Sequence, residues 1–416
     1  MVHLTTALEP GSGVPLYEQL YRSLAGEMRT GALPAGTRMP GKRRLAAELS
    51  VSVNTVDTAY QMLAAEGYLA ARERSGFYVQ EYLALPQVGP DARGPSPAPA
   101  VPEPAAPEPP VRYDLSTRGV DPGLFPFRTW ARLQKELLYS SPELLTNGDA
   151  QGDLALRQAL ADYLAEYRGV QCGAHQVVVG AGLEYLLGLL APLLHGTAAV
   201  ETPGYPRALQ VLENTGMRCC CLPVDEGGLS LDALDRSGAA VCYVTPSHQF
   251  PTGVTMPAGR RAELLHWAAR RPGQRYIIED DYDSELRYGK KPLPALSSYK
   301  EGAPCIYLGS FTKVIYPGFN KAYMVVPKNL ITVFEGAKLL IDRHSSEVHQ
   351  YILAEFIQNG FYYSHVRRLK KIYEKRRQAA VRAIGKYLSA YGHIEGANEG
   401  THLTFIFNHP QDDVKL

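Results

Sequence analysis

The sequence has no apolar run long enough to cross a bilayer, because none of its 416 residues lie in an uncharged apolar stretch of about 18 or more. Its start, Met1 to Leu4, is not a basic segment followed by an apolar one, so we expect no signal peptide. Cysteine is scarce. The six cysteines, three of them adjacent at 219–221, have neither a disulfide framework nor zinc-site spacing. We therefore expect reduced thiols, no metal centre, no membrane segment and a cytoplasmic protein.

Net charge is also almost absent. The 43 Lys and Arg residues against 42 Asp and Glu residues leave +1, which says little about binding partners. The apolar content of 45% is ordinary for a globular protein with a sizeable core. The length allows two or three domains of roughly 150 residues each.

The first 82 residues predict three helices followed by a hairpin. Apolar residues recur at three- and four-residue steps from Leu16 to Met28, which predicts an amphipathic helix that ends at Gly31. A second short helix follows Pro40, and Ser52 is suited to cap a third helix. Residues 68–71 and 77–80 predict two short strands. This order of elements predicts a winged helix–turn–helix domain.

In such a domain the third helix enters the major groove, and residues on either side of that helix contact the DNA phosphates. We predict base contacts from Ser52, Asn54 and Thr55. We predict phosphate contacts from five basic residues, Lys42, Arg43, Arg44, Arg72 and Arg74. Residues 1–82 hold eight basic and eight acidic residues, so this positive charge is local. The alternative is a small helical module that binds protein; the order of elements favours DNA.

A linker follows, because residues 83–112 contain ten prolines among alanine and glutamate and offer nothing for a core. Such a segment is semi-rigid, at about 3.1 Å per residue where extended, and could span roughly 80 Å. It is either a simple spacer or a means for the DNA-binding domain of one chain to reach over the body of another.

Residues 113–416 alternate strands and helices, which predicts an α/β domain with a mostly parallel sheet. Polar clusters follow the strands, at 180–182 before a helix over 183–194, at 201–206, at 245–253 and at 280–283. Open α/β sheets bind ligands at the carboxyl ends of their strands. The glycine-rich turn at 180–182 offers free N–H groups to a phosphate.

One strand end carries a lysine. The strand Cys305–Leu308 leads into Ser310, Thr312 and Lys313. Hydroxyl and N–H groups suit a phosphate, and an amine suits a Schiff base with an aldehyde, which together are what pyridoxal 5'-phosphate needs. Asp280 would hold the ring nitrogen protonated, and the Tyr282 phenol would lie near the ring oxygen. The alternatives are a surface lysine and a solvated acidic loop or magnesium site.

These motifs resemble two known families. Residues 15–20, 40–49, 51–56 and 66–68 resemble the N-terminal domain of GntR regulators. Residues 113 to about 408 resemble class I/II aminotransferases of fold type I, on the segments 180–187, 201–207, 245–253, 278–288, 309–318 and 344–377. The whole chain resembles MocR/GabR-type regulators. Gly41, Lys42 and Val53 depart from the GntR pattern at positions that touch DNA in that family, so the operator sequence does not carry over.

The resemblance implies a fold, a cofactor and an assembly. It implies a mixed, mostly parallel sheet with helices on both faces, pyridoxal phosphate attached to Lys313, and a head-to-tail homodimer. It also assigns residues: Asp280 to the ring nitrogen, Tyr282 to the ring oxygen, and Tyr205 against the cofactor. The phosphate would be held by Gly182, Leu183, Glu184, Ser310 and Thr312, and an effector carboxylate by Arg207.

The chain departs from the aminotransferase pattern twice. Seven residues after the lysine, where the family has an arginine for the phosphate, stands Asn320, and we expect Lys321 to substitute as a point charge. The small subdomain, from about residue 330, ends soon after the strand near 402–407, before the elements that bring an arginine for the α-carboxylate. We therefore expect that subdomain to be incomplete.

Three functions follow as hypotheses. The first is a transcription regulator that senses an amino compound or pyridoxal phosphate. The second is a working aminotransferase with an accessory DNA-binding domain. The third is a cofactor-free DNA-binding dimer. A basic helix over 367–377 is either a solvated face or a second DNA-contacting surface.

Overall fold

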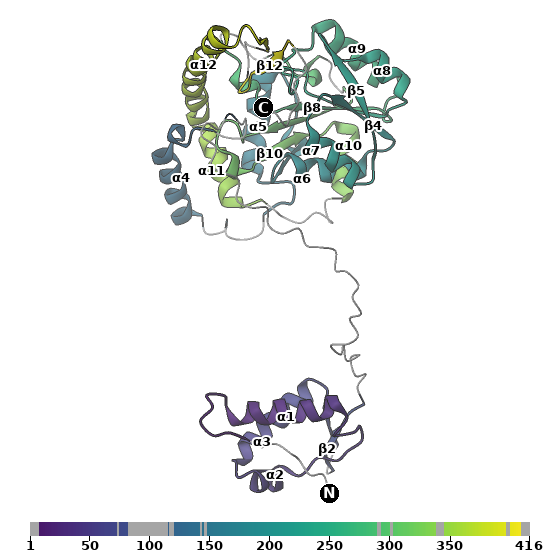
Figure 1. Ribbon diagram of the computed structural model, residues 1–416, viewed down its shortest axis with the longest axis vertical. Helices are drawn as coiled ribbons and strands as arrows, with labels where there is room; N and C mark the ends of the chain where they lie inside the picture. The colour runs from purple at the N-terminus through teal and green to yellow at the C-terminus, as the bar shows by residue number, and fades with distance from the viewer. Residues whose placement is uncertain are drawn as a thin grey trace. The chain divides into compact units, whose positions relative to one another are not determined.

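The computed structural model describes residues 8–72, 75–81, 115, 120–141, 144, 148–288, 293–299, 303–337, 345–396 and 400–408. The chain forms two compact units, Met1–Arg112 and Tyr113–Leu416 (Figure 1). The predicted linker, Arg74 and the last eight residues lie outside the described residues. Within the described ranges, no helix is long and apolar enough to cross a membrane.

The N-terminal unit is a winged helix–turn–helix, as predicted. Its elements are α1 (Leu16–Thr30), α2 (Lys42–Glu48), α3 (Val53–Ala65), β1 (Leu69–Arg72) and β2 (Gly76–Val79). Helix α1 ends at Gly31, which takes the left-handed conformation and donates its N–H to Met28. The predicted cap of α3 is confirmed, because the Ser52 hydroxyl accepts a hydrogen bond from the backbone N–H of Thr55.

The wing strands lie one residue from their predicted positions. They pair antiparallel from Leu69 opposite Val79 to Arg72 opposite Gly76. The ladder reaches Gly76 because its φ of +98° is open to glycine and costly for other residues.

The second unit is built on an eight-stranded sheet in the order β3-β10-β9-β8-β7-β4-β5-β6. Five neighbouring strands, β9 to β5 in that order, are parallel; β10 runs antiparallel to both β9 and β3, and β6 antiparallel to β5. The sheet is therefore mixed and mostly parallel, as predicted. The strands are β3 (Val177–Gly180), β4 (Thr197–Thr202), β5 (Arg218–Asp225), β6 (Gly228–Leu229), β7 (Val241–Val244), β8 (Tyr276–Asp281), β9 (Cys305–Ser310) and β10 (Ala322–Val325).

Helices cover both faces of this sheet (Figure 1). One face packs against α6 (Leu183–Leu190), α7 (Pro206–Asn214) and α10 (Lys328–Ala337). The other packs against α4 (Phe127–Ser140), α5 (Leu154–Arg168), α8 (Leu231–Ser237), α9 (Ala258–Ala269) and α11 (Glu347–Gln358). Helix α6 is shorter than the predicted 183–194, because Pro192 has no N–H to continue it and residues 191–193 form a 3-10 turn.

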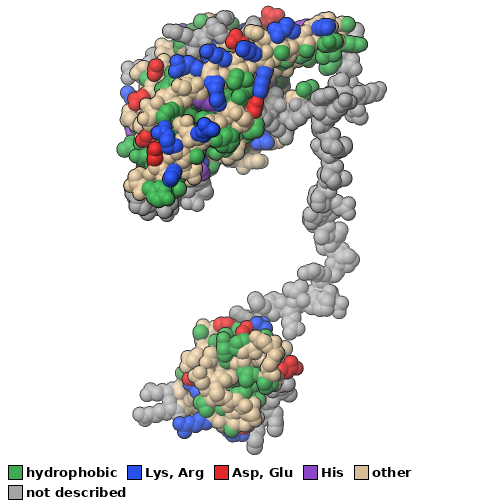
Figure 2. Space-filling view, turned by 90° about the vertical axis from the view of Figure 1, so that its left-hand side faces the viewer, with side chains coloured by type: hydrophobic (Ala, Val, Ile, Leu, Met, Phe, Trp, Pro, Cys, Tyr) green, Lys and Arg blue, Asp and Glu red, His purple; other side chains and the backbone are tan. Residues whose placement is uncertain are grey.

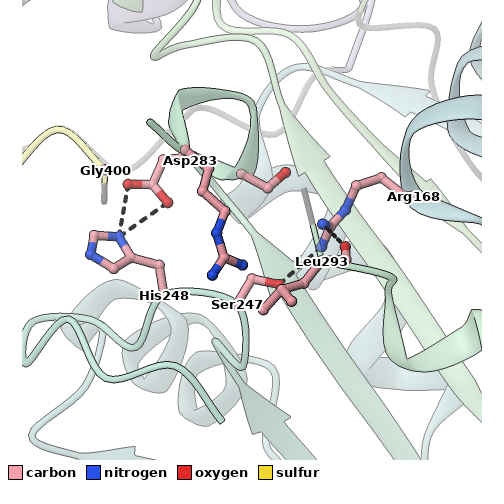
Figure 3. Close-up of a pocket in the computed structure, with 8 residues that line it drawn as sticks. Arg168, Ser247, His248, Asp283, Leu293 and Gly400 are labelled. Carbon is pink, nitrogen blue, oxygen red and sulfur yellow. Dashed lines mark hydrogen bonds and ion pairs between the residues drawn. The ribbon is translucent and has the colours of Figure 1, made fainter. Parts of the chain in front are cut away.

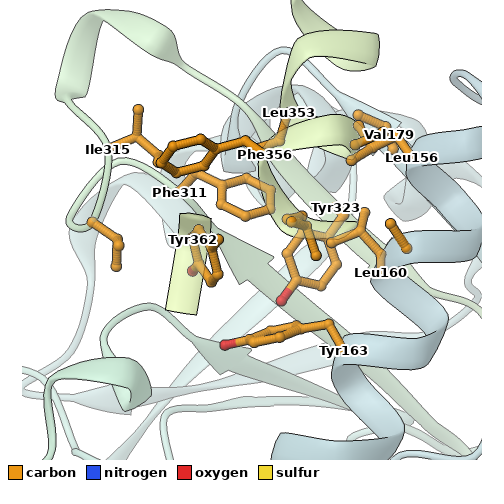
Figure 4. Close-up of a cluster of buried hydrophobic side chains, with 14 of the residues drawn as sticks. Leu156, Leu160, Tyr163, Val179, Phe311, Ile315, Tyr323, Leu353, Phe356 and Tyr362 are labelled. Atoms are coloured by element: carbon orange, nitrogen blue, oxygen red, sulfur yellow. The ribbon is translucent and has the colours of Figure 1, made fainter. Parts of the chain in front are cut away.

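The chain then enters the long helix α12 (Phe361–Tyr387), whose first turns join the core beside α5 and α11. Figure 4 shows this part of the core, where rings such as Phe311, Phe356 and Tyr362 pack together. A two-stranded antiparallel sheet of β11 (Gly392–Glu395) and β12 (Thr404–Phe407) follows.

Alternation along β8 sends its last two residues to opposite faces of the sheet. Asp281 points to the α5 side, where it forms an ion pair with Arg168 at 2.8 Å and accepts a hydrogen bond from the Tyr307 hydroxyl. The side chains of Asp281 and Arg168 are each only 1% exposed. A buried pair of this kind fixes the end of α5 against the sheet.

Replacing Arg168 with methionine keeps the volume and leaves Asp281 buried without its cation. We expect the free energy of unfolding of the second unit to fall by about 3–5 kcal/mol. Arg270→Met is the matched control, because Arg270 pairs with Asp235 at the surface of the same unit, and exposed pairs contribute about 1 kcal/mol or less. Denaturant unfolding of both variants measures the difference; equal losses would contradict the assignment.

Candidate functional site

Four predicted polar clusters meet at one edge of the sheet. The parallel strands β4, β7, β8 and β9 all end there, and β3 ends there too because β10 is antiparallel to both β3 and β9. Across three strands, Gly180 lies opposite Ala322 and Ala322 opposite Ser310. The glycine turn and the serine–threonine turn, 130 residues apart in sequence, therefore follow two strand ends that flank β10 at the same edge of the sheet.

Lys313 lies in the turn after β9 and is half-buried. Burial lowers the pKa of its amine, and the Asp283 carboxylate opposes that shift. Just before it, the Ser310 and Thr312 hydroxyls lie 2.8 Å apart, and the Thr312 N–H donates to the Ser310 hydroxyl. An amine that loses its proton more readily is a better nucleophile toward a carbonyl.

The turn before α6 can only be made by glycine. Gly182 is the N-cap residue of α6, and its φ of +98° is readily adopted only by glycine. A Cβ on Gly182 would lie 2.4 Å from Oδ1 of Asn320, and Nδ2 of Asn320 donates to the carbonyl of Ala181. Asn320 thus stabilises the glycine turn that the sequence predicts to bind the cofactor's phosphate. Lys321 beside it is mostly buried, which lowers the pKa of its amine.

Asp280 points to the opposite face from Asp281, toward the side of α6 and α7. Its carboxylate accepts a hydrogen bond from the Tyr243 hydroxyl, and no ion pair to it occurs within the described part of the chain. Burial raises its pKa to about 7, and the negative charges of Asp281, Asp283 and Glu201 act in the same direction. A buried carboxylate without a cation is a site where a cationic ligand group is favoured.

Aromatic rings surround the predicted ring-oxygen residue, Tyr282. Phe250 meets Tyr282 edge to face with ring centroids 6.2 Å apart, and Tyr205 meets Phe250 in the same way at 6.0 Å. The His248 ring stacks on Tyr282, and its Nδ1 lies 3.0 Å from the Tyr282 hydroxyl. Sequence analysis missed Phe250 and His248 as site residues, although both belong to the polar cluster at 245–253.

His248 also pairs with Asp283, at 2.9 Å between Nδ1 and Oδ2 (Figure 3). His402 packs against His248, and the ligand atoms of His248, Asp283 and His402 lie within 4.8 Å of one another. Arg168 and Arg287 line the small pocket beside Asp283. Since those arginines disfavour a further cation, we interpret His248 and Asp283 as a hydrogen-bonded pair against which the His402 ring packs.

Two predicted ligand residues instead contact each other. Arg207 donates to the Glu184 carboxylate at 3.2 Å, and the Tyr205 hydroxyl donates to the same oxygen at 3.1 Å. The Arg207 side chain is 64% exposed. The predicted effector residue is therefore tied, by a weak surface contact, to the first turn of α6.

The predicted DNA-binding residues surround the start of α3. Ser52 and Asn54 are exposed and Thr55 half-exposed. Lys42 pairs with Asp57 on α3 and lies over the Phe77 ring of the wing, so it also joins these elements. Arg44 pairs with Glu48, and Arg72 lies over the Tyr78 ring.

A groove of about 620 Å³ runs between α2 and the wing. Arg38, Lys42 and Arg44 line it, together with Ser75 and Gly76. Sequence analysis did not include Arg38 among the predicted phosphate contacts. It could have been included, because it is a basic residue two positions before the Pro40 that precedes α2.

The basic helix predicted over 367–377 lies within α12, on the face that Figure 2 shows with Lys and Arg in blue. Several of its side chains hold other segments of the chain. Arg368 donates to the carbonyl of Leu124, Arg376 pairs with Asp121, and Arg377 donates to the carbonyls of Gly396, Gly400 and His402. This arrangement favours a structural role over a DNA-contacting one for those arginines.

Comparison with known proteins agrees with both units. Residues 16–79 match the family model for bacterial regulatory proteins of the gntR family, and residues 120–405 match aminotransferase class I and II. The chain therefore belongs to the DNA-binding transcription regulators in which an aminotransferase-like domain follows a GntR-type domain. Within that class it is of the MocR/GabR type, as its relatives indicate.

The chain is 36% identical to the uncharacterized HTH-type transcriptional regulator YdeL of Bacillus subtilis, over 96% of this chain and 86% of YdeL. It is 34% identical to the probable rhizopine catabolism regulatory protein MocR of Rhizobium meliloti, over 98% and 85% respectively. Among solved structures, the multiple substrate aminotransferase from Thermococcus profundus is similar at 28% identity and a TM-score of 0.61, covering 67% of this chain and 72% of that one.

The raised pKa of Asp280 gives a pH test of this site. In the unfolded chain the carboxyl loses its proton near its usual 3.8, but in the folded protein near 7. Its stabilising contribution is thus full below about pH 4 and is lost as pH rises through 7, at up to about 1.4 kcal/mol per pH unit. Asp280→Asn removes that loss, so the variant gains stability relative to wild type as pH rises from about 4 to 7, and the gain stays constant above pH 7.

Urea unfolding of the cofactor-free proteins at several pH values measures this difference. Other buried carboxyls, such as Glu201 and Glu279, also have pKa values raised to about 7 by burial, but the paired comparison cancels them. Asp235→Asn, at the surface, is the control. Parallel pH curves for wild type and Asp280→Asn would contradict the assignment.

Proposed function

We propose that the aminotransferase-like unit of this regulator binds pyridoxal 5'-phosphate and senses an amino compound, and that its ligand state changes operator affinity. One observation carries the proposal: a lysine amine after β9, a buried carboxylate at the end of β8 and a glycine-capped helix start after β3 lie at the same edge of the sheet, with only β10 between β3 and β9. Register supports it, since Asp280 lies opposite Leu308, five residues before Lys313. The donors fit the cofactor, because each of its three polar parts has a matching group.

Bound pyridoxal phosphate supplies an aldehyde that reacts reversibly with amines and a ring that draws electrons from the amine's carbon. In this chain Lys313 would hold the aldehyde carbon and Asp280 the proton on the ring nitrogen. The phosphate would meet the N–H groups of Gly182, Leu183 and Glu184 at the start of α6. Ser310, Thr312 and Lys321 would add two hydroxyls and a charge.

The aromatic residues would shield the cofactor ring from solvent. Tyr205 and Phe250 would cover the ring of the cofactor, and the Tyr282 hydroxyl would lie near its ring oxygen. An effector amine would compete with Lys313, and its carboxylate would compete with Glu184 for Arg207. Since the Arg207–Glu184 pair is exposed, displacing it costs little.

Regulation requires that the effector favour one arrangement of the protein over another. We propose a head-to-tail homodimer in the cytoplasm, with the winged helix–turn–helix domain of each chain joined to its body through residues 83–112. Displacing Lys313 would then bias how the DNA-binding domains are presented to the operator.

A second candidate function is transamination. Lys313, Asp280 and Tyr282, the groups that such chemistry uses, are all present at the sheet edge. Formation of a keto acid from an amino donor would distinguish a working aminotransferase from a sensor.

Lys313→Ala tests the cofactor proposal. We expect the wild-type protein with pyridoxal phosphate to have a visible absorbance band and, after borohydride, a cofactor fixed to Lys313 in peptide mapping. The variant should lose both. Lys321→Ala should keep the covalent link but bind the cofactor more weakly, since one charge near the phosphate is lost. A wild-type protein that never acquires the band would refute the proposal.

Two substitutions test the DNA surface on an operator selected from random DNA with the full-length protein. Asn54→Ala should cost about 1–3 kcal/mol on the operator and little on non-specific DNA, because it removes a base contact. Arg43→Ala should weaken binding to all DNA and lower the slope of log affinity against log salt by about 1. Arg22→Ala, on α1 and paired with Glu18, is the control. Equal effects at Asn54 and Arg22 would contradict the assignment.

A further inference from the structure

A second pocket lies in the aminotransferase-like unit, lined by none of the residues assigned to pyridoxal phosphate. Its volume is about 60 Å³, and it is bounded by the C-terminal half of α5, the 3-10 turn Ser284–Leu286 and the first turns of α12. Four tyrosines line it, with one carboxylate and two cationic side chains: Tyr163, Tyr167, Tyr362, Tyr363, Glu285, Arg367 and Lys370. The proposed function leaves this pocket unexplained.

Glu285 is nine-tenths buried, and only one of its two carboxylate oxygens has a hydrogen-bond partner among the described residues. Its Oε1 accepts hydrogen bonds from the hydroxyls of Tyr163, at 2.9 Å, and Tyr362, at 3.2 Å. Its buried Oε2 has no hydrogen-bond partner among the residues described. Figure 4 shows Tyr163 and Tyr362 at the edge of the apolar cluster from which these hydroxyls extend. Leaving a buried acceptor unpaired is unfavourable, so a donor inside the pocket is favoured.

The tyrosine rings pack against one another and hold the pocket's shape. Tyr163 stacks on Tyr167 with centroids 5.1 Å apart, Tyr167 stacks on Tyr363 at 5.2 Å, and Tyr362 meets Tyr163 edge to face. Among these walls the Glu285 carboxylate favours a donor that carries positive charge. Burial also raises the pKa of Glu285 to about 7, which a bound cation would lower again.

The opening of the pocket has the opposite charge. Arg367 is exposed and Lys370 is half-buried, and the Glu285 carboxylate raises the pKa of the Lys370 amine against the lowering effect of burial. A simple cation would meet these two side chains unfavourably on entry. A simple anion would meet Glu285 inside. A ligand with both charges matches both ends.

We propose that this pocket binds a short, unbranched amino acid, with its ammonium group against Glu285 and its carboxylate at Arg367 and Lys370. The volume agrees with this size, since it holds roughly four to six water-sized groups. The proposal does not rest on cofactor binding at Lys313. It gives the regulator a second, non-covalent site for amino compounds.

Isothermal titration of the full-length protein with β-alanine tests it. Titrations use cofactor-free protein and protein whose cofactor has been fixed by borohydride, so that reaction at Lys313 cannot contribute. Ethylamine, which lacks the carboxylate, and propionate, which lacks the ammonium group, are the ligand controls. We expect saturable binding of β-alanine, at least about tenfold tighter than that of either control.

Glu285→Gln should weaken β-alanine binding by about tenfold or more, and Glu263→Gln, exposed on α9, should leave it unchanged. Arg367→Gln with Lys370→Gln removes the two positive charges at the opening and leaves Glu285 in place. This double variant should weaken β-alanine binding about fivefold or more and leave ethylamine binding unchanged.

Three results would overturn the proposal: no saturable binding, equal affinity in Glu285→Gln, or equal affinity for β-alanine and both controls. The first would mean that the pocket holds water only. A protein that binds β-alanine but never forms the visible cofactor band would refute the proposed function and leave this site standing.

Discussion

The buried ion pair between Arg168 and Asp281 organises the second unit, because it separates the roles of the two faces of the sheet at the carboxyl end of β8. Alternation makes Asp281 share the α5 side of the sheet with Arg168 and the Tyr307 hydroxyl, where its charge is compensated. The same alternation turns Asp280 toward α6 and α7, where the Tyr243 hydroxyl donates to it. Asp281 is thus structural, whereas Asp280 has no cationic partner among the residues that the structure describes.

The antiparallel strand β10 completes the site. By running against both β9 and β3, it lets the turn before α6 and the turn before Lys313 open at the same edge, and it delivers Asn320 to the glycine turn. At position 320, where the aminotransferase pattern has an arginine, this chain has Asn320, whose side chain is hydrogen-bonded to the glycine turn. The nearby positive charge is that of Lys321. If pyridoxal phosphate binds as we propose, its phosphate would be held more by backbone N–H groups than by an arginine fork.

The sequence predicted those features that depend on interactions between residues close together in the chain. Strand ends, the glycine turn and the Ser52 cap depend on residues within a few positions of one another. The sequence alone could not show why Asp280 rather than Asp281 is free for a ligand, since the partner of Asp281, Arg168, lies more than a hundred residues away. The Glu184–Arg207 and Lys42–Asp57 pairs were missed because each joins side chains of two different helices. Sequence analysis gave Glu285 no role, because its buried tyrosine surroundings come from α5 and α12.

The central claim is that occupancy at Lys313 controls DNA binding. Operator affinity of the full-length protein, measured cofactor-free and loaded with pyridoxal phosphate at fixed salt, tests it most directly. We expect loading to change the wild-type affinity by about fivefold or more, as couplings between sites usually do, and to leave Lys313→Ala unchanged. Identical affinities in both states of the wild type, or the same response in Lys313→Ala, would contradict the account.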